Sequence, residues 1–291
     1  STGYAYEQIA AQIEKDFNQC LKENRHGKFE YINDLFYENI RNGTNISRFK
    51  LYLADLLKEV IIKDSPLPEI AELKKARKNI SSVITTNYDQ MIEQLFSFNP
   101  LIGNDILLSN PYGSVYKIHG CVTQPGKIII TENDYEEFNR KYELIRAQLL
   151  SLFIHNPIIF IGYNIGDKNI KDILRTIFSY VDYNSDEAKK IRDNFLLIEY
   201  ENGSENTEVM EHDIDIEGFE TIRINKLKTD NFIAVYQAIA NLILPVSAMD
   251  IRKVQTVVRE ICEGGAIEVS ITEDLDELDN ADKVLVVGSK K

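Results

Sequence analysis

From residue 80 onward the sequence alternates between short apolar runs and amphipathic segments. The runs are rich in β-branched residues and too short for helices, so we predict strands there. The expected strands cover 82–86, 114–118, 127–131, 158–162, 195–199 and 221–224, and the expected helices cover 88–96, the stretch through Tyr142 and Leu152, 170–178 and 231–244. Near-continuous apolar strands between helices indicate an α/β fold, with a mostly parallel sheet covered by helices on both faces.

The regions on either side of this α/β pattern differ from it. Residues 1–80 are expected to be helical, because apolar residues such as Ile13 and Phe17 recur at a four-residue spacing. The C-terminal part contains a predicted helix, a Gly-Gly break, a strand-like run and an acidic stretch. We therefore expect two units: residues 1–245 as the main domain, and residues 246–291 as a linker helix with part of a second α/β module.

The net charge of −13 limits the classes of partner. Phosphate binding needs concentrated Lys and Arg, so this acidic chain is not expected to bind nucleic acid. Its three cysteines contain no C-x-x-C pair, which argues against a zinc or redox motif and fits a reducing compartment. No apolar run reaches the roughly 18–20 residues of a membrane span, and the first residues do not resemble a signal peptide. We expect a cytoplasmic protein without membrane contact.

Three polar clusters directly follow predicted strands, where the ligands of parallel sheets bind. The first cluster contains Thr85, Thr86, Asn87 and Asp89. Thr86 or Asn87 could simply cap the following helix, with Asp89 favourable to the helix dipole. In the functional interpretation, the Asn87 amide contacts a ribose hydroxyl or a water molecule, and Asp89 braces the turn.

The second cluster is His119-Gly120. A histidine before glycine at a strand end is commonly a hydrogen-bonded loop residue, but its ordinary pKa near neutrality also suits a general base. The other histidines are weaker candidates, because His26 lies in a glycine-containing loop, His155 ends a helix and His212 lies in an acidic, irregular region. We predict His119 as the base.

The third cluster runs from Gly162 and Tyr163 to Asp167. Asp167 is a plausible cap for the next helix, and the glycines allow a sharp turn from strand to helix. A glycine at a strand end also lets a ligand approach the backbone, while the start of a helix offers amide donors to phosphate or ribose. The structural and the binding interpretation are compatible here.

Four motifs together resemble the sirtuin-like domain of bacterial defence proteins. They are T-T-N-Y-D at 85–89, K-I-H-G at 117–120, I-T-E-N-D-Y-E-E-F at 130–138 and F-I-G-Y-N-I-G-D-K-N-I at 160–170. Their order and spacing also fit, and the resemblance covers roughly residues 1–245.

The resemblance implies a Rossmann-like domain that hydrolyses NAD to nicotinamide and ADP-ribose, as an effector of Thoeris-type and related anti-phage systems. It implies a regulated homo-oligomer or a defence-complex partner. Carried over position by position, it makes Asn87 and His119 the catalytic residues. The NAD-binding residues predicted from the same motifs are Thr85, Thr86, Asp89, Gly120, Gly162, Tyr163 and Asp167.

The sequence departs from the sirtuin pattern in two places. Protein deacetylases of the family carry a zinc module with two Cys pairs, which is absent here, so neither zinc nor lysine deacylation is expected. The family also begins with a strand and a Gly-Ala-Gly-x-Ser loop that holds the NAD phosphates, and the segment from Ser1 to Tyr4 resembles the part just after that loop. We therefore expect this chain to lack the first strand and the phosphate loop.

Three functions follow as hypotheses. An NAD glycohydrolase needs no carboxylate pair, because nicotinamide leaves as a neutral group, unlike the leaving group of ordinary glycosidases. A base at a ribose hydroxyl, His119, and an amide that places water, Asn87, would suffice. A sensor that binds NAD or ADP-ribose without turnover would need only the binding residues. Protein deacylation or ADP-ribosyl transfer is disfavoured by the missing Cys pairs.

Overall fold

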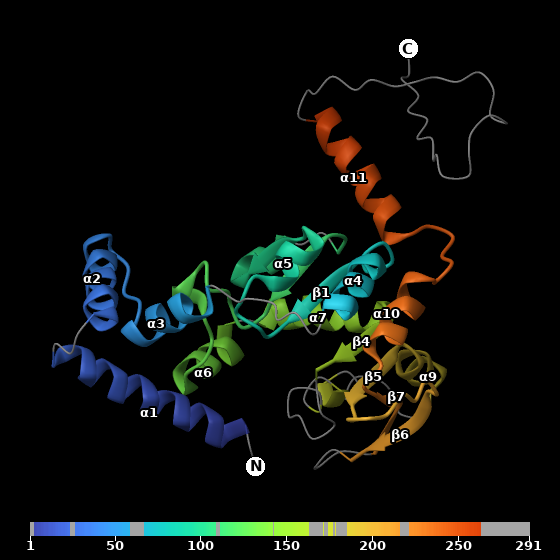
Figure 1. Ribbon diagram of the computed structural model, residues 1–291, viewed down its shortest axis with the longest axis horizontal. Coiled ribbons are helices and arrows are strands. Elements are labelled where there is room, and N and C mark those ends of the chain that lie inside the picture. The colour runs from blue at the N-terminus through green and yellow to red at the C-terminus, as the bar shows by residue number, and fades with distance from the viewer. Residues whose placement is uncertain are drawn as a thin grey trace.

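The fold is a mixed α/β structure with a helical N-terminal part (Figure 1). The computed structural model describes residues 3–23, 27–58, 67–108, 111–141, 143–162, 171, 174–176, 178, 185–215 and 221–262. Within them, helices and strands alternate from residue 80 onward, as the sequence pattern predicts.

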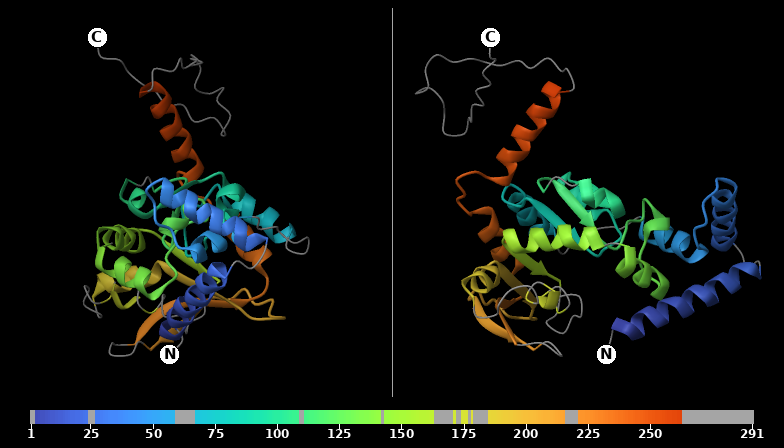
Figure 2. Two further views of the ribbon diagram at one scale, coloured as in Figure 1. Left: turned by 90° about the vertical axis from the view of Figure 1, so that its left-hand side faces the viewer. Right: turned by 180° about the vertical axis from the view of Figure 1, so that it is seen from behind.

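Four helices precede the first strand. They are α1 (Gly3–Lys22), α2 (Lys28–Arg41), α3 (Arg48–Leu57) and α4 (Leu67–Ala76). The first three lie together on one side of the molecule, away from the second sheet (Figures 1 and 2). They share a small apolar core around Leu21, Ile32 and Leu51. Ser47 caps α3, because its hydroxyl accepts a hydrogen bond from the Lys50 N–H at 3.3 Å.

The first sheet has three parallel strands in the order β1-β3-β2. The strands are β1 (Ser82–Thr85), β2 (Asn99–Ile102) and β3 (Ser114–Lys117), and the connections contain α5 (Met91–Phe96) and a 3-10 helix, η1 (Gly103–Leu108). Side chains alternate between the two faces. Val83 and Val115 pack with Phe96 on one face, whereas Ile84 and Tyr116 belong to the main core on the other.

The second sheet has the order β4-β5-β7-β6 and is parallel except for the β6–β7 pairing. Its strands are β4 (Ile158–Ile161), β5 (Phe195–Tyr200), β6 (Met210–Ile214) and β7 (Ile222–Thr229). The further helices of this part of the chain are α6 (Glu132–Lys141), α7 (Glu143–His155), α9 (Asp186–Asp193) and α10 (Phe232–Ala240). Helix α10 packs on one face of β5 and β7, and α9 belongs to the core on the other.

Helix α7 joins the two sheets through one apolar core. Its Ile145, Leu149 and Phe153 are buried in the same cluster as Tyr116 of β3 and Phe160 of β4. The stacked pair of Phe153 and Phe160, with ring centroids 6.0 Å apart, lies in this cluster. Both sheets therefore have helices on either side, which is the Rossmann-like layering that the sequence indicates.

Three local predictions are wrong. Residues 127–131 form no strand: Pro125–Lys127 is a short 3-10 helix, η2, and Asp134 then accepts the N–H groups of Ile130 and Thr131 at 3.1 and 2.9 Å. His212 lies within β6, opposite Ile224 of β7, instead of in an irregular region. The single expected sheet is two sheets in the described part of the chain, with β1 and β4 each at an edge.

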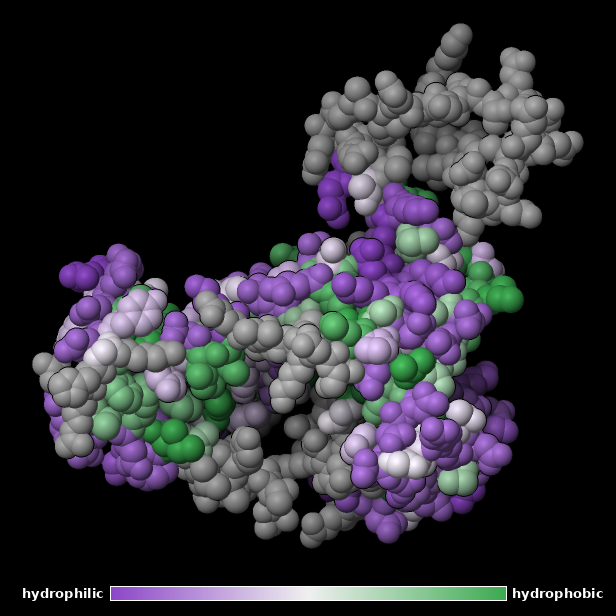
Figure 3. Space-filling model, viewed as in Figure 1, coloured by the Kyte–Doolittle hydropathy of each residue, from purple (hydrophilic) through white to green (hydrophobic). Residues whose placement is uncertain are grey.

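The last described helix, α11 (Ala248–Cys262), confirms that this segment is helical, as the sequence predicts, and projects from the body (Figures 1 and 2). Its Arg252 donates hydrogen bonds to the carbonyl oxygens of Ile80 at 2.7 Å and Arg77 at 2.9 Å, and its guanidinium lies 4.9 Å from the ring of Phe98. The segment between α10 and α11 exposes apolar side chains, among them the fully exposed Ile243. Hydrophobic residues are visible on the surface of this part of the molecule (Figure 3). No described helix is both long and apolar enough to cross a bilayer.

The anchoring of α11 by Arg252 generates a stability prediction. Replacing Arg252 by Lys removes the planar fork that binds two carbonyl groups at once. We expect the free energy of unfolding to fall by about 1–3 kcal/mol, the range for a lost charge-assisted hydrogen bond, and the α11 amides to exchange faster in hydrogen-exchange measurements. Arg259→Lys, at an exposed position of the same helix, is the control and should leave both quantities unchanged. Equal effects of the two variants would contradict the anchoring role.

Candidate functional site

The register of β1 against β3 determines where the first two polar clusters lie. The strands are parallel, and Thr85 is paired with Lys117 at their carboxyl ends. The Ile118 N–H donates to the Thr85 carbonyl oxygen at 3.2 Å, which continues the ladder by one step. Asn87 and His119 each follow two residues after this pair. Neighbouring strands lie about 4.8 Å apart, so both residues extend from the same edge of one sheet at the same level.

The loop after β1 has a defined conformation that leaves Asn87 exposed. The Asn87 N–H donates to the Thr85 hydroxyl at 3.0 Å. Helix α5 begins only at Met91, three residues later than the sequence pattern predicts, and the Met91 N–H donates to the Asp89 carboxylate at 2.9 Å. Neither Thr86 nor Asn87 is therefore the N-cap of α5.

Hydrogen bonds connect this loop to the loop after β3. The Val122 N–H donates to the Tyr88 carbonyl oxygen at 2.9 Å, and the Tyr88 hydroxyl donates to the Ile129 carbonyl oxygen at 2.8 Å. The Ile129 N–H in turn donates to the His119 carbonyl oxygen at 2.9 Å. The residues around 129 thus support both loops, although they form no strand.

His119 is buried, with only 9% of its surface exposed. Its ring meets Tyr135 of α6 edge to face at a centroid distance of 5.4 Å and Phe138 at 6.4 Å. No described residue forms a hydrogen bond with the imidazole. Burial in this apolar environment disfavours the charged form and lowers the pKa of His119 from its ordinary 6.5 to about 4. At neutral pH the ring is therefore uncharged and able to accept a proton.

Gly120 is required by both conformation and space. Its φ is +92°, a value that glycine adopts without strain. A Cβ atom at this position would lie 2.4 Å from the carbonyl oxygen of Lys127 and 2.8 Å from the Cα of Ile128. The loop after β3 therefore passes directly against the backbone of residues 127 and 128, and this contact fixes the turn that follows His119.

The third polar cluster lies on the other sheet. Gly162 follows β4 with φ +81°, is exposed and has open space where a Cβ would be. Tyr163 and Asp167 lie outside the described residues, as does His26. The structure thus brings together the clusters at 85–89 and 119–120, while the remainder of the third cluster stays a prediction.

Sequence reasoning missed the charged residues beneath the loops. Lys117 in β3 is 1% exposed and lies 3.1 Å from the carboxylate of Glu93 in α5. Lys50 of α3 lies 2.5 Å from Asp134 of α6, and this contact together with the Ile130 and Thr131 N–H groups holds the pKa of Asp134 below its usual value, against the opposing effect of burial. The available signal was a lysine at an apolar position of the strand, since Lys117 lies two residues after Val115 and therefore on the same face, toward α5.

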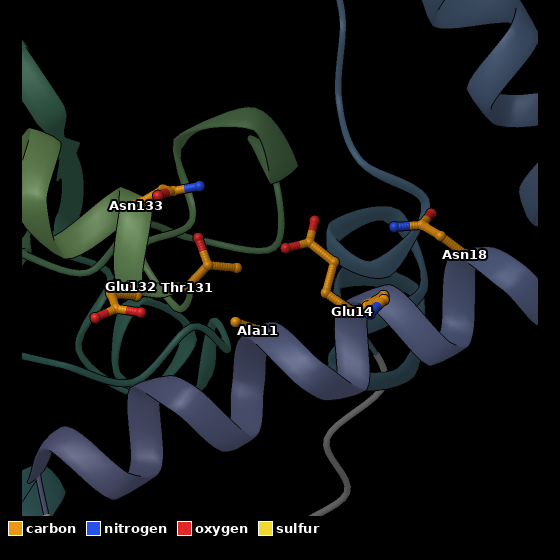
Figure 4. Close-up of a pocket in the computed structure, with 7 residues that line it drawn as sticks. Ala11, Glu14, Asn18, Thr131, Glu132 and Asn133 are labelled. Atoms are coloured by element: carbon orange, nitrogen blue, oxygen red, sulfur yellow. The ribbon is translucent and has the colours of Figure 1, made fainter.

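A hollow of about 350 Å³ opens between α1 and the start of α6 (Figure 4). Glu14 of α1 points toward Thr131 across it, and Glu132 and Asn133 form its other side. None of the predicted site residues lines this hollow. In the described part of the chain, no three His, Cys, Asp or Glu side chains gather as a metal site would require.

The polar strand ends and their order agree with a comparison to known families. Residues 81–217 match a family model described as a SIR2-like domain. This stretch of the chain is therefore similar to SIR2-like domains. The matched stretch begins one residue before β1 and extends beyond β6, so it contains Asn87, His119 and Gly162.

Curated bacterial relatives of the chain include a defense-associated sirtuin and two NAD(+) hydrolases. The chain is 30% identical over 131 residues to defense-associated sirtuin 2 of Bacillus subtilis, covering 42% of this chain and 13% of that protein. It is 28% identical over 157 residues to the NAD(+) hydrolase ThsA of Acinetobacter baumannii (strain 532279), covering 51% and 31%. A third relative, ThsA of Enterococcus faecium, is 25% identical over 169 residues, covering 53% and 35%. The chain thus spans about a third or less of the length of these relatives.

The close approach at Gly120 predicts a strong effect of a single methyl group. Gly120→Ala introduces both a strained positive φ and a clash with backbone, and we expect the free energy of unfolding to fall by roughly 3 kcal/mol or more. Gly203→Ala is the matched control, since Gly203 also has positive φ (+76°) but open space at the Cβ position. It should lose only the conformational part, about 1–2 kcal/mol. Equal losses in chemical denaturation would show that the contact is not tight.

The buried imidazole predicts a dependence of stability on pH. The unfolded chain binds a proton at His119 near pH 6.5, whereas the folded chain binds it only near pH 4. Stability from this residue is therefore complete above pH 6.5 and falls as the pH drops toward 4, by roughly 3 kcal/mol in total.

Denaturation of wild type and His119→Gln between pH 4 and 7 tests this pKa. The variant should lose most of this part of the pH dependence, whereas His155→Gln, at an exposed position, should retain it. Parallel curves for wild type and His119→Gln would rule out the buried, neutral histidine.

Proposed function

We propose that the chain hydrolyses NAD+ to nicotinamide and ADP-ribose, with Asn87 and His119 as the catalytic residues. The observation that carries the proposal is the register of β1 against β3, which brings an exposed amide and a buried, neutral imidazole to the same edge of one sheet. The similarity to proteins named NAD(+) hydrolase supports the choice of substrate. Thr85, Thr86, Asp89, Gly120 and Gly162, with Tyr163 and Asp167, are proposed to line the NAD site.

The reaction divides between these two side chains. Water attacks the anomeric carbon of the nicotinamide ribose as the bond to the nicotinamide nitrogen breaks, and the bonding electrons leave with nicotinamide, which becomes neutral. The products are ADP-ribose, nicotinamide and one proton. We assign His119 to polarise a ribose hydroxyl or accept the proton, and Asn87 to hold the water and the ribose through its amide.

The low pKa of His119 has two opposing consequences. A neutral imidazole at physiological pH has its lone pair available, so the ring does not have to lose a proton before it can act as a base. A group with a pKa near 4 is also a weak base, so the imidazole suits polarisation of a hydroxyl through a hydrogen bond better than full removal of its proton. The acid limb of the kcat/KM profile should accordingly lie near pH 4, well below pH 6.5.

The biological role that we propose is anti-phage defence, in which depletion of NAD+ stops the infected cell. This proposal is based on the similarity to a defense-associated sirtuin and to ThsA proteins. We further propose that residues 1–245 form the NAD-hydrolysing unit, that the reaction takes place in the cytoplasm without zinc, and that assembly with further copies or a defence partner regulates it.

Nicotinamide release by the purified full-length protein tests the proposed reaction. Wild type should convert NAD+ to nicotinamide and ADP-ribose, as followed by chromatography. His119→Ala and Asn87→Ala should each lower the rate by about 10²-fold or more, the usual contribution of a positioned catalytic group. His155→Ala, at an exposed position on α7, is the control and should retain the wild-type rate.

Other outcomes of this assay would separate the alternatives. Binding of NAD+ without release of nicotinamide would favour a sensor of NAD or ADP-ribose. Release that requires an acylated peptide would favour deacylation. Full activity of both site variants would remove Asn87 and His119 from the reaction.

A further inference from the structure

A buried charged pair lies directly beneath the two loops of the candidate site. Lys117 is the last residue of β3 and only 1% of it is exposed, and its ammonium is 3.1 Å from a carboxylate oxygen of Glu93, which is 7% exposed. Among the described residues, neither carboxylate oxygen of Glu93 has a hydrogen-bond partner, and the ion pair with Lys117 is its compensating contact. Such a pair needs further contacts to offset the cost of removing both charges from water.

The ammonium of Lys117 has a second contact, with the loop after β1. It donates a hydrogen bond to the backbone carbonyl oxygen of Asp89. Lys117 ends β3 two residues before His119, and Asp89 follows Asn87 by two residues in the loop after β1. One side chain therefore connects the segment that carries the imidazole to the segment that carries the amide.

Stability alone is a weak explanation for this pair. Apolar side chains of similar volume at buried ion pairs are often neutral or stabilising, and the surroundings on this face are apolar, with Val115 and Phe96 buried nearby. An apolar residue in place of Lys117 would bury well, but it would leave the Asp89 carbonyl without this donor. The structural effect of the lysine is therefore to fix the position of the Asp89 backbone relative to the end of β3.

We propose that Lys117 is a positioning residue, which sets the Asn87 loop against His119 through the Asp89 carbonyl oxygen, with Glu93 holding the ammonium in place. The proposal rests on the proposed function for its catalytic consequence, since it assigns Lys117 no contact with NAD+. Its structural part, the restraint on residues 87–89, is independent of that function.

Kinetics of Lys117→Met test the catalytic consequence. Displacement of a catalytic group by about 1 Å can lower the rate about 10²-fold, so we expect a fall of that size in kcat with a smaller change in KM. Lys226→Met is the matched control, because Lys226 is also buried and paired, 2.5 Å from Glu199, but lies in β7 of the second sheet. It should lower stability without lowering kcat. Equal losses of kcat in both variants would overturn the proposal.

The Asn87→Ala background distinguishes positioning from a general loss of structure. If Lys117 acts through Asn87, adding Lys117→Met to Asn87→Ala should lower kcat by less than threefold further, because the group that it positions is already gone. A further loss of about 10²-fold would show that Lys117 acts independently of Asn87, and would contradict the proposal. Lys117→Arg keeps the charge and a donor, so it should recover part of kcat.

Hydrogen exchange tests the restraint without reference to activity. The amide protons of Asn87 and Met91 should exchange at least tenfold faster in Lys117→Met than in wild type, and at the wild-type rate in Lys226→Met. Unchanged exchange at these amides would overturn the positioning role even if kcat falls. Faster exchange in a protein whose wild type releases no nicotinamide would instead support the restraint and reject the proposed function.

A double variant avoids the problem of an unpaired buried charge. Lys117→Met could fail to fold because it leaves Glu93 charged and without a partner. Lys117→Met combined with Glu93→Leu removes both charges at similar volume and should fold. We expect this double variant to show the same tenfold faster exchange and the same loss of kcat. Wild-type exchange and wild-type kcat in the double variant would refute the proposal.

Discussion

The parallel pairing of β1 with β3 is the constraint on which the candidate site depends. Each strand is only four residues long, and β3 is the central strand of its sheet, between β1 and β2. The pairing of Thr85 with Lys117 therefore decides which residues extend past the sheet together. A slip of one residue would turn Val83 and Ile84 to the opposite faces of the sheet. The buried positions on both faces make such a slip costly, so the apolar packing also fixes the polar edge.

Burial gives the two sides of the site different properties. The imidazole of His119 is enclosed by aromatic rings of α6, whereas Asn87 is exposed. The loops around them are joined through backbone groups of residues 119–130, so their positions depend on irregular structure instead of on the sheet ladder. Loops that carry function are commonly held in this way by a rigid scaffold.

Much of the fold follows from the sequence, because strands covered on both faces leave continuous apolar runs. β1, β3, β4 and β5 all appear in such runs and were predicted at nearly their observed bounds. β2 was missed because it is short and contains Pro100, which an edge strand tolerates. The apolar run at 127–131 looks like a strand locally, but the Asp134 carboxylate takes the N–H groups that a ladder would need. Such competition between side chain and ladder depends on tertiary contacts.

The site was predicted to the extent that its residues follow strands. The sheet edge shared by Asn87 and His119 follows from two apolar runs that end in polar residues. The burial of His119 depends on how closely α6 packs against its ring, which the spacing of motifs along the sequence does not give. The hydrogen bond from the Met91 N–H to the Asp89 carboxylate also depends on the observed start of α5 at Met91. Pairings between distant segments, such as Lys50 with Asp134, leave no local pattern.

The attachment of α11 has a mechanical consequence. Arg252 binds the carbonyl oxygen of Ile80, two residues before β1, and its Cδ lies where it would be 2.9 Å from a Cβ added at Gly113, one residue before β3. Helix α11 is thus attached near the N-terminal ends of β1 and β3, the two strands that are followed by Asn87 and His119. A four-residue strand is about 13 Å long. A force applied along α11 would therefore be transmitted through β1 and β3 to the loops after them over this short distance.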